Sequence, residues 1–345
     1  MFLLKIFKHG RLKGSLLAAF VSLVFILSAC KQSSDCTRED VFCAGLVTDV
    51  LGINDHGINQ DTWAGMQEVK TNGIVDRVEY IESMDTRDYE KNITYFAENG
   101  YDVIITTGVG LRDETLHAAD QYPDSVFIGM NQPQAETRTN LIPITFAEDQ
   151  IGFVAGASAA RVSETRIIGA ACETSEIDSM WRTCEGFRAG AKFVDENINV
   201  QVIYRDSGDS EKLFLDDDWG YDTAQKLIGR GADVIFAAGG VTGQGALRAA
   251  TEKEVNAIGA ERDQGAVLGE SGSSVLTSIY GNASLEVQRV LRLLKDGKIN
   301  GAQIGQIKFV PLNQKFPERF TKVLNTLLFA LWTGEIETNV TLRKP

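Results

Sequence analysis

Residues 44–67 read AGLVTDVLGINDHGINQDTWAGMQ, which combines a short apolar run, a loop that carries glycine and the start of a helical pattern. The apolar run ends in Asp49, and the helix is predicted to open at Asn59. A buried strand followed by a helix N-terminus places a carboxylate and free backbone N–H groups around one small concavity. We therefore predict that half of a ligand-binding cleft lies at this loop.

Short apolar runs alternate with amphipathic stretches along most of the chain. This alternation predicts an α/β protein with parallel sheets that are covered by helices on both faces. The predicted strands are residues 41–48, 75–81, 103–107, 126–130, 142–146, 167–171, 200–204, 234–238, 257–260 and 275–279, with a further apolar run at 304–310. A strongly apolar stretch at 320–333 is predicted to be a packed C-terminal helix rather than a membrane span, because polar residues interrupt it.

The sequence pattern indicates that the chain consists of two similar halves. Residues 100–105, GYDVII, and 231–236, GADVIF, each end a helical stretch at glycine and begin a strand. At 345 residues the chain also exceeds the roughly 250–300 residues at which single cores stop growing. We therefore expect two lobes, although such similarity also arises from the general pattern of helix–strand units.

The N-terminus has the pattern of a bacterial lipoprotein signal. Four basic residues precede an apolar segment, which ends in Leu27-Ser28-Ala29-Cys30. We expect cleavage of residues 1–29, lipid attachment at Cys30, and a polar tether over residues 30–40. The alternative is an uncleaved membrane anchor.

Charge and motif content exclude several classes of function. Removal of residues 1–29 changes the formal net charge from −13 to −17, and such an acidic surface is a poor partner for nucleic acid. The chain contains none of the motifs GxxxxGK[ST], HExxH, CxxC or GxSxG, and it has only three histidines. We therefore predict a protein that is not an enzyme and needs no cofactor.

Four cysteines remain once Cys30 carries lipid. Cys36 with Cys43, and Cys172 with Cys184, are candidate disulfides in an oxidising compartment, and free buried thiols are the alternative. Their spacing does not match a zinc site, so no metal is expected.

A second glycine-rich loop, AAGGVTGQG at residues 237–245, follows one predicted strand and precedes a helix. Gly240 and Gly243 would let backbone N–H groups approach a polar ligand, whereas the alternative is a tight strand-to-helix turn. Its place at the C-terminal edge of a strand favours the ligand-lining role.

Three motifs together resemble the basic membrane protein family of substrate-binding lipoproteins, whose characterised members bind purine nucleosides for ABC import. They are LVTDVLGINDHGINQDTWAGM, AAGGVTGQG and IGAERDQ, the last at residues 258–264. The resemblance implies a type I periplasmic-binding-protein fold, with two Rossmann-like lobes joined by a three-stranded hinge. It assigns residues 41–147 with 277–304 to one lobe, and 148–276 with 305–340 to the other. The implied partners are a purine nucleoside and the permease and ATPase of an ABC importer, and the implied location is the extracytoplasmic face of a membrane.

The resemblance also implies residue roles. Asp49 matches the acceptor of the ribose hydroxyls, Asn59 matches a base-contacting amide, and Asp113 falls near a base-contacting carboxylate. Phe214, in Phe-Leu-Asp, resembles the aromatic that stacks on the base, and Trp181 is an alternative platform. Helix capping for the three polar residues and core packing for Phe214 are the alternatives.

Three positions depart from the family pattern, since Ile58 stands for Phe, Glu261 for Asp and Tyr280 for Lys. Glu261 would still accept from a ribose, and Tyr280 removes a cation near the sugar. These changes leave open a modified nucleoside, a different purine preference or another small polar ligand. A sensor or receptor lipoprotein of the same fold is the alternative function.

Overall fold

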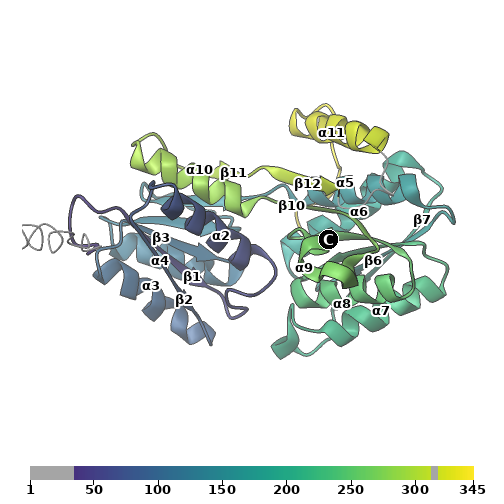
Figure 1. Cartoon of the computed structure of the whole chain (residues 1–345), viewed down its shortest axis with the longest axis horizontal. Helices are drawn as coiled ribbons and strands as arrows, with labels where there is room; N and C mark the ends of the chain where they lie inside the picture. The colour runs from purple at the N-terminus through teal and green to yellow at the C-terminus, as the bar shows by residue number, and fades with distance from the viewer. Residues whose placement is uncertain (1–34, 312–317) are drawn as a thin grey trace, which may run out of the picture. The chain divides into compact units, whose positions relative to one another are not determined.

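The computed structural model describes residues 35–311 and 318–345, and these residues form two six-stranded sheets (Figure 1). The first sheet has the order β11-β5-β4-β3-β1-β2, and the second has the order β12-β10-β9-β8-β6-β7. All neighbouring strands are parallel except β10 and β12. The strands are β1 Cys43–Thr48, β2 Arg77–Glu82, β3 Val103–Thr107, β4 Val126–Met130, β5 Leu141–Thr145, β6 Ile167–Cys172, β7 Asn199–Tyr204, β8 Val234–Ala238, β9 Asn256–Ala260, β10 Val275–Gly281, β11 Gln303–Ile304 and β12 Ile307–Pro311.

Helices cover both faces of each sheet, as the continuous apolar strands predict. In β1, Leu46 packs in the same apolar cluster as Met66 of α2, whereas Val47 packs with Phe96 of α3 on the opposite face. The helices are α2 Ile58–Thr71, α3 Tyr89–Glu98, α4 Arg112–Gln121, α5 Glu148–Val162, α6 Asp178–Val194, α7 Asp217–Gly229, α8 Gly240–Glu252, α9 Gln264–Leu268, α10 Ala283–Lys295 and α11 Glu318–Trp332, with 3-10 turns η1 Thr86–Asp88, η2 Val109–Leu111, η3 Ser210–Lys212 and η4 Gly269–Gly272. Of the described helices, none has the length and apolar content needed to cross a membrane.

The two similar sequence segments lie at equivalent places in the two sheets. GYDVII begins β3, which pairs with β1, and GADVIF begins β8, which pairs with β6. The aspartate in each segment binds backbone at or just before the start of the neighbouring strand: Asp102 accepts from the N–H of Cys43 at 2.7 Å, and Asp233 from the N–H of Thr165 at 2.8 Å. The repeat therefore reflects two α/β units of the same design.

The chain passes between the two sheets at three places in residues 36–311. It leaves the first sheet after β5, returns to it after β10, and crosses again between β11 and β12. The expected boundary at residue 277 falls inside β10, which pairs with strands of the second sheet as far as Gly281. We therefore place this crossing after Gly281.

Glycines allow α5 and α6 to pack with their backbones in contact. A Cβ atom added at Gly190 would lie 1.8 Å from the carbonyl oxygen of Phe153, and one added at Gly156 would lie 1.9 Å from that of Phe187. Both distances are far below van der Waals contact, so a larger side chain would force the helices apart. This pair forms the closely packed cover of one face of the second sheet.

Among the described residues, two disulfides join the two candidate cysteine pairs. Cys36 is bonded to Cys43 at the start of β1, with the Cα atoms 5.7 Å apart. Cys172, at the end of β6, is bonded to Cys184 of α6, with the Cα atoms 6.6 Å apart. The expected lipidation site, Cys30, and the expected signal peptide lie outside the described residues.

Candidate functional site

A hydrogen-bonded cluster fixes the loop that follows β1. Asp49 Oδ1 accepts from Asn59 Nδ2 at 2.8 Å and from the N–H of Leu51 at 3.1 Å. Asn59 is fully buried, and its Nδ2 also donates to the carbonyl oxygen of Gly52 at 2.9 Å while its Oδ1 accepts from the Thr107 hydroxyl. The amide therefore has protein partners at both its nitrogen and its oxygen. In this conformation Asn59 positions Asp49 and ties the end of β1 to the end of β3.

The second oxygen of Asp49 has no such partner. Among the described residues, no group donates a hydrogen bond to Asp49 Oδ2. A Cβ atom at Gly108, where φ is +89°, would lie 2.6 Å from this oxygen, so glycine is needed beside it. Burial raises the pKa of Asp49 to about 6, against the opposing hydrogen bonds from Asn59 and Leu51. One acceptor atom thus faces the end of β3 with its hydrogen-bonding capacity unused.

The N–H groups expected to be free at the start of α2 are already occupied. Asp55 Oδ1 accepts from the N–H of Gly57 at 2.9 Å and of Gln60 at 3.1 Å, and its Oδ2 accepts from the N–H of Asn59 at 2.9 Å. Asp55 therefore caps the helix, which begins at Ile58, and the expectation of free backbone N–H groups at this helix start is wrong. The sequence signal for this cap was an aspartate just ahead of the helical pattern.

A carboxylate also binds backbone N–H groups of the second glycine-rich loop, at residues 237–245. Glu261 follows β9 directly, and its Oε1 and Oε2 accept from the N–H groups of Gly239 at 2.9 Å and Gly240 at 2.7 Å. Burial raises the pKa of Glu261 to about 7, with the two hydrogen bonds acting in the opposite direction. The side chain therefore takes the place that an anion would occupy at the N-terminus of α8. Gly243 lies within the first turn of this helix.

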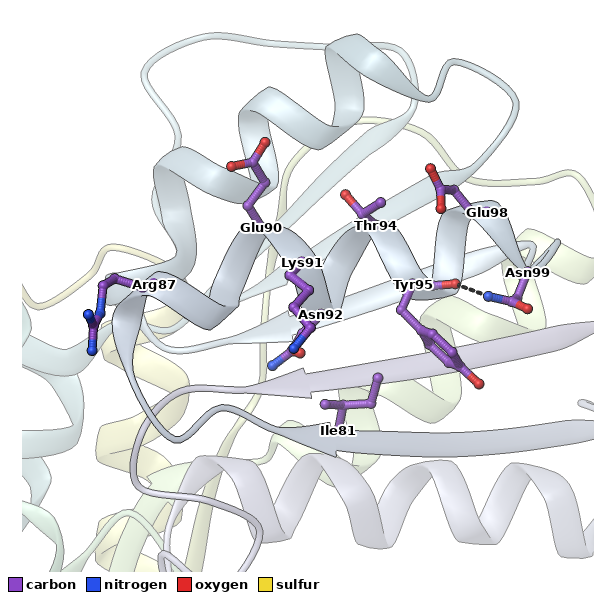
Figure 2. Close-up of a pocket in the computed structure, with 9 residues that line it drawn as sticks. All are labelled: Ile81, Arg87, Glu90, Lys91, Asn92, Thr94, Tyr95, Glu98 and Asn99. Atoms are coloured by element: carbon purple, nitrogen blue, oxygen red, sulfur yellow. Dashed lines mark hydrogen bonds between the residues drawn. The ribbon is translucent and has the colours of Figure 1, made fainter.

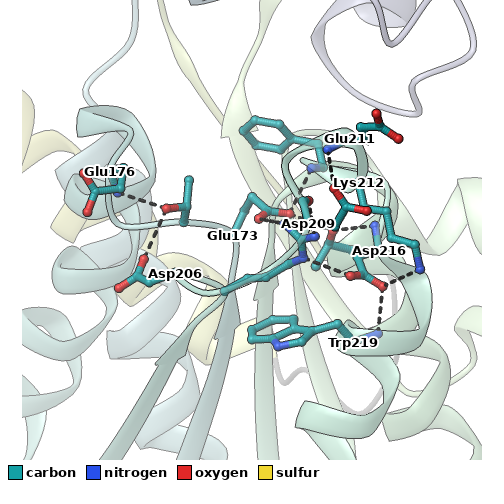
Figure 3. A network of polar contacts seen from close by, with 12 residues as sticks. Glu173, Glu176, Asp206, Asp209, Glu211, Lys212, Asp216 and Trp219 are labelled. Carbon is teal, nitrogen blue, oxygen red and sulfur yellow. Dashed lines mark hydrogen bonds and ion pairs between the residues drawn. The ribbon is translucent and has the colours of Figure 1, made fainter.

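A buried ionic network sits beside this loop (Figure 3). Glu173 directly follows β6 and is fully buried, and it accepts from Arg205 Nη1 at 3.2 Å, from the N–H of Phe214 at 2.9 Å and from the Thr242 hydroxyl at 2.8 Å. Arg205 directly follows β7 and also donates to Asp216 Oδ2 at 3.0 Å. The network fixes the segment from residue 205 to 216.

Phe214 reaches its place through an unusual backbone conformation. Its φ is +63°, in the left-handed region, and its carbonyl oxygen accepts from the N–H of Val241 at 2.9 Å. A Cβ atom at Gly240 would lie 2.9 Å from that same oxygen. The close approach holds Phe214 against the start of α8, beside Glu261, with its ring partly exposed.

Two other candidate residues lie apart from these clusters. The Asp113 side chain is 77% exposed and forms an ion pair with Arg112. Trp181, on α6, stacks on Tyr204 with ring centroids 6.0 Å apart, and its Nε1 donates to the Thr341 hydroxyl at 3.2 Å. The structure therefore gives both residues surface or packing contacts.

Tyr280 is buried in β10, where it pairs in register with Lys308 of β12. The Lys308 ammonium lies 5.7 Å from the centre of the Tyr280 ring. Burial raises the pKa of Tyr280, so its hydroxyl stays protonated. A cation thus lies on the neighbouring strand, in register with the position where the family pattern has lysine.

Figure 2 shows a surface pocket that lies along α3 and the end of β2. Its lining contains none of the candidate ligand residues, and it is made by Ile81, Arg87, Glu90, Lys91, Asn92, Thr94, Tyr95, Glu98 and Asn99. The chemistry at the strand ends is therefore separate from this pocket.

The sequence was compared with known proteins. A family model described as Bmp, ABC transporter substrate-binding protein PnrA-like, matches residues 43–310. The chain belongs to the Bmp family. Bmp proteins are substrate-binding components of ABC transporters, which fits strand ends that carry hydrogen-bonding groups.

Individual Bmp relatives carry different names. The ABC transporter nucleoside-binding protein BmpA of Lactococcus lactis subsp. cremoris is 28% identical over 309 residues, which span 83% of this chain and 86% of that protein. The transcriptional activator protein med of Bacillus subtilis is 26% identical over 340 residues, or 94% of this chain and 98% of that protein. An ABC transporter solute-binding protein from Conexibacter woesei has a similar fold, with a TM-score of 0.71 at 19% identity over 88% of this chain and 100% of that one. The type I periplasmic-binding fold expected from the sequence is thereby confirmed.

Proposed function

We propose that this Bmp protein is a lipid-anchored, extracytoplasmic binding protein that captures a purine nucleoside and delivers it to an ABC permease and its ATPase. The observation that carries the proposal is Asp49 Oδ2, an acceptor at the end of β1 that receives no hydrogen bond from any residue the structure describes. A ribose hydroxyl donating to this oxygen would form a charge-assisted hydrogen bond of about 1.5–3 kcal/mol.

The occupied N–H groups support a ligand without phosphate. Asp55 fills the N-terminus of α2, and Glu261 fills that of α8. A phosphate would have to displace one of these carboxylates or lie close to it, and like charges repel at such distances. A neutral nucleoside meets no such repulsion.

Binding would use the two lobes, built on the two sheets, with the ligand closing them like a hinge. A ligand that contacts both lobes stabilises the closed form by its differential affinity for that form. We propose Phe214 as the aromatic that packs on the base and Asp49 as the residue that holds the sugar. Anchoring through Cys30 would keep the protein near its permease.

Isothermal calorimetry and thermal unfolding test this function on protein that has been freed of co-purified ligand. Guanosine, inosine and adenosine should each give heat, and at 100 times the dissociation constant a ligand should stabilise the fold by about 2.7 kcal/mol. Asp49→Asn should weaken binding at least tenfold, whereas Asp120→Asn, at an exposed ion pair with Arg138, should leave it unchanged. No heat and no thermal shift with any nucleoside would refute the proposal.

The med relative supports a second candidate, a sensor that binds the same ligand but feeds no transporter. A gene neighbourhood with an ATPase and two permeases would favour transport. Uptake of labelled nucleoside that is unchanged after deletion of the gene, with binding intact, would favour the sensor.

A further inference from the structure

Arg262 is a partly buried arginine whose side chain has no hydrogen-bond or ion-pair partner among residues 35–311 and 318–345. Other partly buried arginines in residues 35–311, such as Arg182 and Arg289, form ion pairs with carboxylates. Within the described residues, the Arg262 guanidinium donates no hydrogen bond and forms no ion pair, and only its backbone N–H is engaged, with the carbonyl oxygen of Ala260 at 2.7 Å. A guanidinium carries five N–H donors that are costly to leave unpaired away from water.

The acidic residues beside Arg262 in the sequence are committed to other donors. Glu261 accepts from two N–H groups at the start of α8, and Asp263 Oδ1 accepts from the N–H of Ala266 at 3.0 Å. In the sequence, Glu261 and Asp263 are the nearest candidates for an ion pair with Arg262. In the fold, both carboxylates accept hydrogen bonds from backbone N–H groups instead, and neither pairs with the guanidinium.

Asp55, in the loop before α2, and Asp61, in its first turn, lie within electrostatic reach of Arg262. Burial raises the pKa of both Asp55 and Asp61, and the positive charge of Arg262 opposes that rise at each. Neither carboxylate bonds to it, because Asp55 caps α2 and Asp61 Oδ2 accepts from the N–H of Ser284 at 2.9 Å. The guanidinium thus sits at the C-terminal end of β9, within electrostatic reach of Asp55 and Asp61, and none of the described residues accepts from its donors.

We propose that Arg262 is a specificity-determining residue that reads the edge of the base and selects 6-oxopurine nucleosides such as guanosine and inosine. The inference rests on the proposed function. A 6-oxopurine presents two acceptors, O6 and N7, which match the two parallel donors of a guanidinium. Adenine presents an amino donor beside N7, so that one guanidinium N–H would face another donor.

Surrounding charge explains why the partner is a pair of neutral acceptors rather than an anion. Three carboxylates, on Asp55, Asp61 and Glu261, lie around this end of β9, and an anionic ligand would be repelled by all of them. Neutral carbonyl and ring-nitrogen acceptors satisfy the donors without that cost.

The test is calorimetry of the purified protein with guanosine, inosine and adenosine, repeated for three variants. Wild type should prefer the two 6-oxopurines, and Arg262→Gln should reduce that preference by about 5- to 150-fold. Arg262→Lys should lose most of the preference as well, because an ammonium keeps the charge but not the paired donors. Arg230→Gln is the matched control, since Arg230 is exposed at the end of α7 and forms no ion pair with a described residue. Thermal unfolding without ligand should give similar midpoints for all four proteins.

The outcomes distinguish a failure of the base-reading role of Arg262 from a failure of nucleoside binding itself. If wild type binds all three nucleosides equally, or if Arg262→Gln keeps the preference or weakens all three equally, the base-reading role is overturned and nucleoside binding stands. If wild type binds no nucleoside, the proposed function fails and the inference fails with it. A loss of preference in both Arg262 variants, with Arg230→Gln unchanged, supports the assignment.

Discussion

Removal of the charge on Glu173 should destabilise the second sheet more than any change at a surface ion pair. The Glu173 carboxylate is fully buried and accepts three hydrogen bonds, from Arg205, Phe214 and Thr242. In Glu173→Gln one side-chain oxygen remains as an acceptor, but the new NH2 group is itself a donor and faces groups that also donate hydrogen bonds. Arg205 is also buried, so part of its charge loses compensation.

The expected cost follows from the geometry of this network. Removing one partner of a buried ion pair costs about 3–5 kcal/mol. Asp216 still pairs with Arg205 at 3.0 Å, which moves the estimate to the lower end, about 3 kcal/mol. The loss should be accompanied by loosening of residues 205–216, because Glu173 also binds the backbone of this segment.

Urea unfolding followed by circular dichroism measures the change in the free energy of unfolding. The control is Asp296→Asn, which breaks an exposed ion pair with Lys298 and should cost less than about 1 kcal/mol. If Glu173→Gln costs no more than this control, the network does not stabilise the fold and the reasoning is refuted. Hydrogen exchange at residues 205–216 provides the independent measure, since protection there should fall in Glu173→Gln alone.

Three further predictions concern pH, packing and crosslinking. Burial raises the pKa of Glu261 from 4.5 to about 7, so its contribution to stability is complete below about pH 4.5 and is lost as the pH rises through 7. The stability of wild type relative to Glu261→Gln should therefore fall across that window in unfolding titrations, and a constant difference would contradict the assignment. Gly190→Ala should lower the free energy of unfolding in urea by at least about 1–3 kcal/mol, because its Cβ atom would lie 1.8 Å from a carbonyl oxygen of α5. The control Gly229→Ala, whose Cβ atom would have no atom within 4 Å, should be neutral or stabilising by up to about 1 kcal/mol. Equal effects of the two substitutions would rule out the close packing. Replacing Cys172 and Cys184 together by alanine should lower the free energy of unfolding by about 2–4 kcal/mol, and an unchanged midpoint would show that this crosslink does not stabilise the fold.

Strand positions followed from local chemistry and could be predicted. Each buried parallel strand needs a short continuous apolar run, so β3, β4 and β8 were predicted with the bounds that the structure gives them. The repeat of GYDVII and GADVIF likewise predicted equivalent strands, because a glycine and an aspartate perform the same backbone task in both halves. The two-residue strand β11 carries too little pattern to be recognised.

The partners of the polar residues could not be predicted, because they come from distant parts of the chain. Asp49 was expected at a ligand site, and its position at the end of β1 was enough to suggest this. The sequence does not show that the Asn59 amide would hydrogen-bond to Asp49 and Thr107, or that the Asp55 carboxylate would accept from the N–H groups at the start of α2.

The sequence by itself thus determined the α/β architecture, the family and the acidic residue at the end of the first strand. Those features depend on the periodicity of apolar residues and on motifs within a few residues of one another. Only the tertiary structure decided which polar atoms remain free. Glu261 and Arg262 are neighbours in the chain, yet the Glu261 carboxylate is bound to the backbone at the start of α8, whereas the Arg262 guanidinium has no partner in the part of the chain that the structure describes. That difference arises because the hydrogen-bond partners of buried polar groups are set by tertiary packing and not by adjacency in the sequence.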